Sequence, residues 1–537
     1  MQATMTAAVL AVPVAVPGVV AGAHALVLAR LRRRAPHAEP RPVAVLVGAA
    51  GPEPEQAAEA APVPEPPPAA GAPWWGLVSP VAVLGSAMLL TAALPRGGAL
   101  DAFDGLLRAD APTVWMLFVV GAVALVACAS LPSYGAGEGL SARATATLHT
   151  LVQAFLAAMC LAVVTANLGV LWVAVEATTI VTAFLVGHRH TRRSVEAAWK
   201  YVVICSAGIA LAFLGTVLVY YAARQAGVDE ADALDWPTLV AHAGALDPSV
   251  TRLGVSLVIL GFGAKAGLVP LHAWLPDAHS QAPAPVSALM SGVLLSVAFL
   301  AVLRYETIAD AALGHGWTRL LLTGIALLTL ALATGLLLAQ RDYKRMLAYS
   351  SMEHMSLIAL GTAIGTPLAL AAVLLHIAGH GLAKSVAFCA SGHVLRLTGT
   401  TLIGRVRGLL ARLPWLGGVF GLAVLALLGF PPFSLFASEL GIVRAGFAAG
   451  AGMGWATGAA LLLVLVAFAA LAARTARMVL GPSPVPSTPA LAPAPVPGGA
   501  GAVWPLVLGL VACAVLGLTT GPLTDLLHDA AATIGGH

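Results

Sequence analysis

Charged residues are scarce in this sequence. Asp, Glu, Lys and Arg make up 10% of its 537 residues and apolar residues 59%, and the mean hydropathy is +0.90. Because a soluble domain carries roughly 25% charged residues, this chain has too little charge to cover a surface that faces water. Its net charge of +4 is small and its basic residues are dispersed, which excludes a nucleic-acid partner. The composition therefore predicts a membrane protein whose main surroundings are the lipid bilayer.

Cysteine is also scarce, and the recognised cofactor and catalytic motifs are missing. Iron–sulfur clusters, CxxC zinc sites and a disulfide scaffold all need cysteines that are close together. Nucleotide-binding loops, catalytic-serine motifs and HExxH zinc motifs do not occur either. We therefore expect no cofactor, no metal and no catalytic residue in this chain. The five cysteines all lie inside apolar stretches, far apart in sequence: Cys128, Cys160, Cys205, Cys389 and Cys513.

Long apolar stretches, by contrast, are abundant. A helix needs about 20 apolar residues to cross the hydrocarbon core of a bilayer. Fourteen stretches meet this need and predict an all-α polytopic fold, the first of them being a retained helix because it is too long for a signal peptide. They are roughly 5–29, 76–95, 112–132, 143–166, 167–187, 196–221, 251–275, 285–304, 317–339, 344–365, 367–395, 414–446, 453–480 and 503–522.

Two of these stretches carry prolines that predict broken helices. Pro270 and Pro276 interrupt the seventh, and Pro431 and Pro432 interrupt the twelfth. Proline inside a helix removes a hydrogen bond, and in lipid the freed carbonyl groups must meet protein or water. Two broken helices therefore indicate a polar interior at the middle of the membrane.

The spacing of the two breaks suggests an internal duplication. Helices four to eight would form one five-helix repeat and helices nine to thirteen a second one. Because five is odd, the second repeat would be inverted, as in many transporters. The expected organisation is a first helix (1–34), a Pro/Ala/Glu-rich cytoplasmic linker (35–73), helices two and three (74–142), repeat one (143–310), repeat two (311–480), a Pro-rich linker (481–502) and a last helix with its tail (503–537).

Basic residues predict the orientation in the membrane. With fourteen helices, the odd-numbered loops hold eighteen of the 28 Lys and Arg residues, among them Lys344, and the even-numbered loops hold seven, among them Arg304. Basic loops face the cytoplasm. We therefore expect both termini on the non-cytoplasmic side of the cell inner (plasma) membrane.

Ionisable side chains inside the apolar stretches are the candidate functional residues. Such a side chain costs at least ~2.5–3.5 kcal/mol in a bilayer and usually faces the interior of a helix bundle. The main candidates for proton transfer are Glu176, Lys265, His376, His380, Lys384 and Glu439, with Lys200, Glu353 and His354 as accessory candidates.

Three of them follow helical spacing. His376, His380 and Lys384 stand at i, i+4 and i+8, so they share one helix face. Histidine titrates near neutral pH, and protons can hop along such a row if water fills the gaps. A metal site, a haem site and a purely structural polar cluster are the alternatives for this row.

The other candidates have alternatives as well. Glu176 and Lys265 could form a charge pair that switches, or a static ion pair. Glu439 beside the second break could be an equivalent terminal group, or a residue exposed at a helix end. Lys200 could join the buried groups or extend to the membrane interface.

The sequence also resembles a known family. GAKAGLVPLHAWLPDAHSQAPAPVSALMSGVLL, DYKRMLAYSSMEHMSLIALG, HIAGHGLAKSVAFCASGHV and GFPPFSLFASE are similar to motifs of the antiporter-like membrane subunits. These subunits occur in NADH:quinone oxidoreductase, in membrane-bound nickel–iron hydrogenases and in multisubunit Na⁺/H⁺ antiporters. The motifs look most like those of hydrogenase-4 component F. The resemblance extends over roughly residues 105–480.

The resemblance implies roles for the candidates. Glu176 and Lys265 would be the coupled Glu–Lys pair, Glu439 the terminal carboxylate on the second broken helix, and the histidine–lysine row the central hydrophilic axis. The partners would be other membrane subunits and a peripheral redox arm. One departure stands out: relatives often carry His or Lys on the eighth helix, where this chain has only Ser291 and Ser296.

Three functions therefore remain open at the level of sequence. The first is a proton-translocating, non-redox subunit of a redox-driven membrane complex. The second is a subunit of a cation/proton antiporter without a redox partner. The third is a structural subunit that does not pump.

Overall fold

The computed structural model of the protein describes residues 2–34, 74–482 and 503–535. The predicted linker 35–73 and nearly all of 481–502 lie outside this part. Within the described residues, ten helices are long and apolar enough to cross a membrane. They are α1 (Gln2–Arg34), η1 with α2 (Trp74–Ala93), α3 (Ala111–Gly137), α4 (Ala142–Val164), α5 with η2 (Leu168–Arg189), α6 (Arg192–Gln225), α10 to α11 (Ala284–Leu313), α12 (His315–Ala339), α14 (Pro367–Thr398) and α18 (Ala451–Leu480).

The remaining apolar stretches are helical too, but shorter, interrupted or more polar. They contain α8 (Pro248–Lys265), α9 (Trp274–Gln281), α13 (Tyr343–Ile364), α16 (Pro414–Leu427), α17 (Ser434–Ala448) and α19 (Trp504–Leu518). Every one of the fourteen predicted stretches therefore coincides with helix. The number of membrane crossings and the inverted-repeat arrangement stay predictions.

Both proline-containing stretches are divided. Pro270 lies between the end of α8 at Lys265 and the start of α9 at Trp274, and Pro431 and Pro432 lie between α16 and α17. The prediction that Pro276 also interrupts the helix was wrong. Pro276 is the third residue of α9, where a backbone N–H has no partner within the helix, so proline costs no hydrogen bond there.

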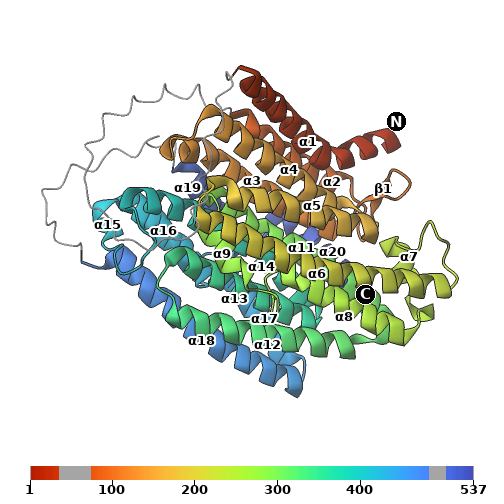
Figure 1. Ribbon diagram of the computed structural model, residues 1–537. Helices are drawn as coiled ribbons and strands as arrows, with labels where there is room; N and C mark the ends of the chain where they lie inside the picture. The colour runs from red at the N-terminus through yellow and green to blue at the C-terminus, as the bar shows by residue number, and fades with distance from the viewer. Residues whose placement is uncertain (1, 35–73, 483–502, 536–537) are drawn as a thin grey trace, which may run out of the picture.

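Helix α14 is the centre of the bundle (Figure 1). Its apolar window is fully buried, and it contacts α3, α10, α13, α16, α17, α19 and α20. Helices α12 and α18 lie at one edge of the bundle and α1 at the opposite edge. Polar side chains in the middle of α14 are therefore enclosed by protein rather than by lipid.

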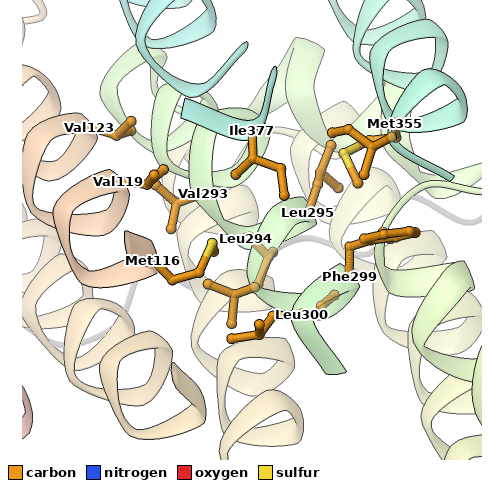
Figure 2. Packing of buried hydrophobic residues seen from close by; sticks show 14 of the residues in the cluster. Met116, Val119, Val123, Val293, Leu294, Leu295, Phe299, Leu300, Met355 and Ile377 are labelled. Atoms are coloured by element: carbon orange, nitrogen blue, oxygen red, sulfur yellow. The ribbon is translucent and has the colours of Figure 1, made fainter. Parts of the chain in front are cut away.

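The eighth apolar stretch packs tightly against this centre. It contains a π-helical turn, η4 (Met290–Leu294), whose Val293 and Leu294 lie among apolar side chains of α3 and α14 (Figure 2). Gly292 permits the closest approach, because a Cβ atom there would stand 2.8 Å from the carbonyl oxygen of Gly381 on α14. Small residues at such positions allow helix backbones to touch inside a membrane.

Several elements have no counterpart among the predicted helices. Strands β1 (Leu100–Ala102) and β2 (Leu107–Ala109) form an antiparallel hairpin between α2 and α3. Helix α7 (Trp236–Ala241) lies in the loop before α8, α15 (Leu409–Arg412) precedes α16, and α20 (Thr524–Gly535) follows α19. The apolar face of α20 is buried against α3 and α14, so the tail expected after the last helix is part of the bundle.

Two basic residues expected in loops are instead buried inside helices. Arg304 lies within α11 and pairs with Asp110, the residue that caps α3. Lys344 lies in the first turn of α13 and donates hydrogen bonds to the carbonyl oxygens of Ser280 and Ala282. Both side chains therefore have partners inside the protein, and neither lies in a loop.

Candidate functional site

The polar face of α14 is the main feature of the interior. His376, His380 and Lys384 are all fully buried, and their i, i+4, i+8 spacing places them along one side of the helix. This face is directed toward α13, which runs antiparallel beside it.

Helix α13 supplies a matching polar face. Ser350, Glu353 and His354 lie at i, i+3 and i+4, so they also share one side. The Lys384 ammonium donates to the backbone carbonyl of Leu347, at 2.7 Å, and to the hydroxyl of Ser350. The N-terminal part of the α13 face therefore meets the C-terminal part of the α14 face, as antiparallel helices require.

Three histidines form a cluster at the other end of these faces. The ring of His354 lies between the two α14 histidines, with ring centroids 5.2 Å from His376 and 5.1 Å from His380. Nδ1 of His354 stands 3.1 Å from Nε2 of His376. Neither ring nitrogen of His380 has a hydrogen-bond partner among the described residues. The cluster lies on the same face of α14 as Lys384, toward the second broken helix.

That helix supplies the outer end of the row. Ser438 of α17 lies 2.9 Å from Nδ1 of His376, and Glu439 follows it in sequence. Gly429, in the gap between α16 and α17, has a φ of +65°, and a Cβ atom there would stand 2.5 Å from the Glu439 carboxylate. The break therefore makes room for this carboxylate, which is partly exposed at the molecular surface. One ligand atom each of His354, His376 and Glu439 lie within 4.8 Å of one another.

Lys265 forms a second polar centre, at the end of α8. Its ammonium donates to the Thr179 hydroxyl at 2.7 Å and to the Tyr201 hydroxyl at 2.5 Å. It also stands 4.8 Å from the centroid of the Tyr201 ring. The buried amine is thus held by two hydroxyl groups from α5 and α6.

Glu176 is not in direct contact with Lys265. Within the described part of the chain, no nitrogen–oxygen pair of these two residues is close enough for an ion pair. Thr179, one turn further along α5, occupies the position beside the amine instead. The expected Glu176–Lys265 charge pair is therefore absent in this conformation. Oε2 of Glu176 is buried without a hydrogen-bond partner.

His279, which sequence reasoning missed, lies between the two centres. It is fully buried on α9, and neither ring nitrogen has a hydrogen-bond partner among the described residues. Its ring stacks on Phe388, one turn beyond Lys384 on α14, with centroids 5.1 Å apart. On its other side lies Trp274, whose ring contacts Tyr201 edge-on. A buried histidine therefore lies between the two centres, and its burial could not be read from sequence.

The serines of the eighth stretch have different surroundings. Ser291 and Ser351 of α13 share a hydrogen bond of 2.7 Å. Ser296 is buried without a partner among the described side chains. They offer hydroxyl groups beside the row, but no titratable group.

Lys200 belongs to the periphery rather than to the buried row. Its side chain is 47% exposed and pairs with Glu196 at 2.7 Å and with Asp277 at 3.0 Å. Asp277 also binds Arg345 of α13. This network links α6, α9 and α13 at one end of the first broken helix. It fits a lysine at the membrane interface.

The family to which this chain belongs is shown by comparison with known proteins. The sequence profile of the family described as "NADH:quinone oxidoreductase/Mrp antiporter, TM" matches residues 165–465, more than half of the chain. The chain belongs to this family. It is a membrane antiporter-like subunit, and all six main candidates lie inside the matched region.

Curated relatives from two kinds of complex are similar to this member of the family. It is 40% identical over 300 residues to the hydrogenase-4 component F homolog of Methylacidiphilum infernorum, a match covering 56% of this chain and 63% of the relative. It is 34% identical over 305 residues to NADH-quinone oxidoreductase subunit N of Desulforudis audaxviator, covering 56% and 58%. The matches thus span less than two thirds of either relative.

Solved structures share the fold. A chain of the Mrp complex from Dietzia sp. DQ12-45-1b matches with a TM-score of 0.79 at 20% identity, covering 99% of this chain and 98% of that one. A chain of respiratory complex I from Thermus thermophilus matches with a TM-score of 0.62 at 26% identity, covering 83% and 93%. These neighbours belong to multisubunit membrane complexes.

Proposed function

We propose that this chain is a proton-translocating subunit of a redox-driven membrane complex, of the hydrogenase-4 or NADH:quinone oxidoreductase type. The observation that carries the proposal is a group of ionisable side chains packed between α13, α14 and α17: Lys384, His380, His354 and His376 are buried, and Glu439 lies beside them with partial exposure. A lone buried ionisable group has structural explanations, but five packed together beside a broken helix suit proton transfer.

The proposed route divides into short steps. In the second half of the molecule, Lys384 exchanges protons with the histidine cluster, and Glu439 exchanges them with the adjoining surface. In the first half, Lys265, with its hydroxyl partners Thr179 and Tyr201, takes up and releases protons as Lys384 does in the second half. His279 bridges the halves, and water molecules complete the steps that side chains do not span.

Glu176 would act on Lys265 through a change of contacts. In the described conformation the amine rests on two hydroxyls, so a rotation toward Glu176 would exchange neutral partners for a charged one. An opposite charge within about 4–6 Å favours the protonated amine. Formation of this pair would therefore favour uptake of a proton by Lys265, and its loss would favour release. Distant redox chemistry would drive proton translocation by changing these contacts.

The wider assignments belong to the same proposal. The breaks at Pro270 and at Pro431 with Pro432 would mark the centres of two inverted repeats, 143–310 and 311–480. The complex would lie in the cell inner membrane with both termini of this chain outside the cytoplasm. The redox cofactors would belong to a peripheral arm of partner subunits.

A subunit of a cation/proton antiporter is the second candidate. The high similarity in fold to the Mrp complex chain favours it. So does the 30% identity over 289 residues to a protein of the Na(+)/H(+) antiporter of Alkalihalophilus pseudofirmus. A non-pumping structural subunit is the third, and its mark would be normal pumping after loss of Lys265.

Gentle extraction of the tagged chain from its own membranes separates the first two candidates. We expect a nickel–iron or flavin-containing peripheral arm to co-purify. Small hydrophobic subunits alone, without metal or flavin, together with sodium-dependent proton exchange, would replace the redox-driven proposal with the antiporter.

A further inference from the structure

Three side chains at the outer end of the buried row have the composition of a metal site. His354 of α13, His376 of α14 and Glu439 of α17 come from three helices that are distant in sequence, and their ligand atoms lie within 4.8 Å of one another. We propose that these residues bind a Zn²⁺ ion, with a water molecule as the fourth ligand. Two histidines, one carboxylate and one open position are a known zinc arrangement.

The distance between the histidines fits this ion. Nδ1 of His354 and Nε2 of His376 are 3.1 Å apart. Two nitrogens on a tetrahedral Zn²⁺, each at 2.0–2.1 Å, stand about 3.3 Å apart. The two rings therefore already have nearly the separation that a shared ion needs.

Ser438 sets the ring orientation of His376. The Ser438 hydroxyl donates to the carbonyl of Leu435 at 3.0 Å, so it accepts a hydrogen bond from Nδ1 of His376. The lone pair of His376 then lies on Nε2, which faces His354. A partner that fixes the second ring nitrogen in this way is typical of histidines that bind metals.

The two histidine rings and Glu439 must each move to complete the site, because an ion 2.0–2.1 Å from both nitrogens cannot lie on the line of their present hydrogen bond. His354 now donates from Nδ1 to its neighbour; with the ion present its ring hydrogen would lie on Nε2 instead, and Nδ1 would bind the metal. The Glu439 carboxylate would approach by up to roughly 1.5 Å to reach bonding distance. The Glu439 carboxylate lies in the gap next to Gly429 and is partly exposed.

The ligand types select the metal. Nitrogen and carboxylate ligands without thiolate suit Zn²⁺, whereas Mg²⁺ and Ca²⁺ prefer oxygen ligands only. Cys513, the cysteine nearest to α17, contacts Ser434 and the carbonyl of Gly379 instead. The proposed site therefore contains no sulfur.

Binding of added zinc to the purified chain, in its native complex, tests the proposal. We expect one tightly bound Zn²⁺ per chain, and X-ray absorption should give nitrogen and oxygen neighbours near 2.0 Å without sulfur. Glu439→Gln keeps the size of the side chain and should weaken zinc binding at least tenfold, as should His354→Gln. Co²⁺ in place of Zn²⁺ should give the visible absorption of a tetrahedral site in the native protein only.

His149→Gln is the matched control. His149 belongs to another buried histidine pair, with ring centroids 5.1 Å from His24, and it is no part of the proposed site. Its loss should leave zinc binding unchanged. Zinc binding that survives both Glu439→Gln and His354→Gln, a sulfur neighbour, or no stoichiometric zinc in the native protein would each overturn the proposal.

The consequence for function rests on the proposed proton row. Zn²⁺ on His354 and His376 would occupy the nitrogens that relay protons, so micromolar zinc should inhibit proton translocation. The two proposals fail separately. If zinc binds stoichiometrically but does not inhibit proton translocation, the metal site is supported and the proposed proton row is contradicted. If proton translocation needs His376 but the protein does not bind zinc, the proton row is supported and the metal site is contradicted.

Discussion

The buried ion pair between Asp110 and Arg304 gives the sharpest stability prediction. The guanidinium donates to both carboxylate oxygens, at 2.5 and 2.8 Å, and also to the Thr113 hydroxyl at 3.0 Å. It stands 4.2 Å from the centroid of the Trp236 ring. Asp110 also caps α3 by accepting the backbone N–H of Thr113. A single carboxylate therefore holds the start of α3 to the middle of α11.

Asp110→Ala removes both functions at once. A buried charge left without its partner costs about 3–5 kcal/mol, and loss of a helix cap costs about 1 kcal/mol. We expect the free energy of unfolding in mixed detergent micelles to fall by about 4–6 kcal/mol. Asp101→Ala is the control, because it breaks the more exposed pair in which one guanidinium nitrogen of Arg108 donates to both carboxylate oxygens. It should cost less than about 1 kcal/mol.

The double variant Asp110→Asn with Arg304→Met tests the reasoning itself. Replacing both charges leaves no unpaired ion, so most of the lost stability should return. A cost below about 1 kcal/mol for Asp110→Ala, or a double variant as unstable as the single one, would refute the account of this pair.

Three further predictions concern acid stability, packing and the Lys265 centre. Burial alone would raise the pKa of Asp110, but the neighbouring guanidinium and hydrogen bonds hold that pKa below its ordinary value in the folded protein. The ionised carboxylate should therefore contribute fully to the free energy of unfolding above pH ~3.9, and this contribution should be lost as the pH falls toward the lowered pKa of the folded state. An acid titration of unfolding measures this loss. Gly292→Ala should cost about 1–3 kcal/mol through overpacking, whereas Gly335→Ala, which meets nothing within 4 Å, should be neutral or stabilising in the same unfolding assay. Tyr201→Phe removes one of the two hydroxyls on Lys265 and should slow coupled proton translocation without loss of assembly; Lys265→Ala should abolish it, and an unchanged rate in both would contradict the role of this centre.

The helices were accessible from sequence because their signal is local. Apolar length predicted the long helical stretches, and a proline inside an apolar run predicted both interruptions. The prediction for Pro276 was wrong because the effect of a proline depends on its position in the helix, and Pro276 lies in the first turn of α9. Helix α20 was missed since it is short and amphipathic, and its apolar face becomes meaningful only beside α3 and α14.

The candidate site was accessible in part. The spacing of His376, His380 and Lys384 fixes their common face, whatever surrounds it. The contacts between helices are not encoded in any local pattern, so the place of Thr179 beside Lys265 could not be foreseen. His279 stood in a polar segment next to a break, where sequence gives no sign of full burial.

The central claim is that the buried row carries protons across the membrane. The most direct measurement is proton translocation by the complex in sealed liposomes, compared between the native chain and His380→Leu. Leucine fills the space that a bridging water molecule would need, so the account predicts at least a tenfold lower rate with an intact complex, while His149→Leu leaves the rate unchanged. Equal rates in the native and His380→Leu complexes would contradict the claim.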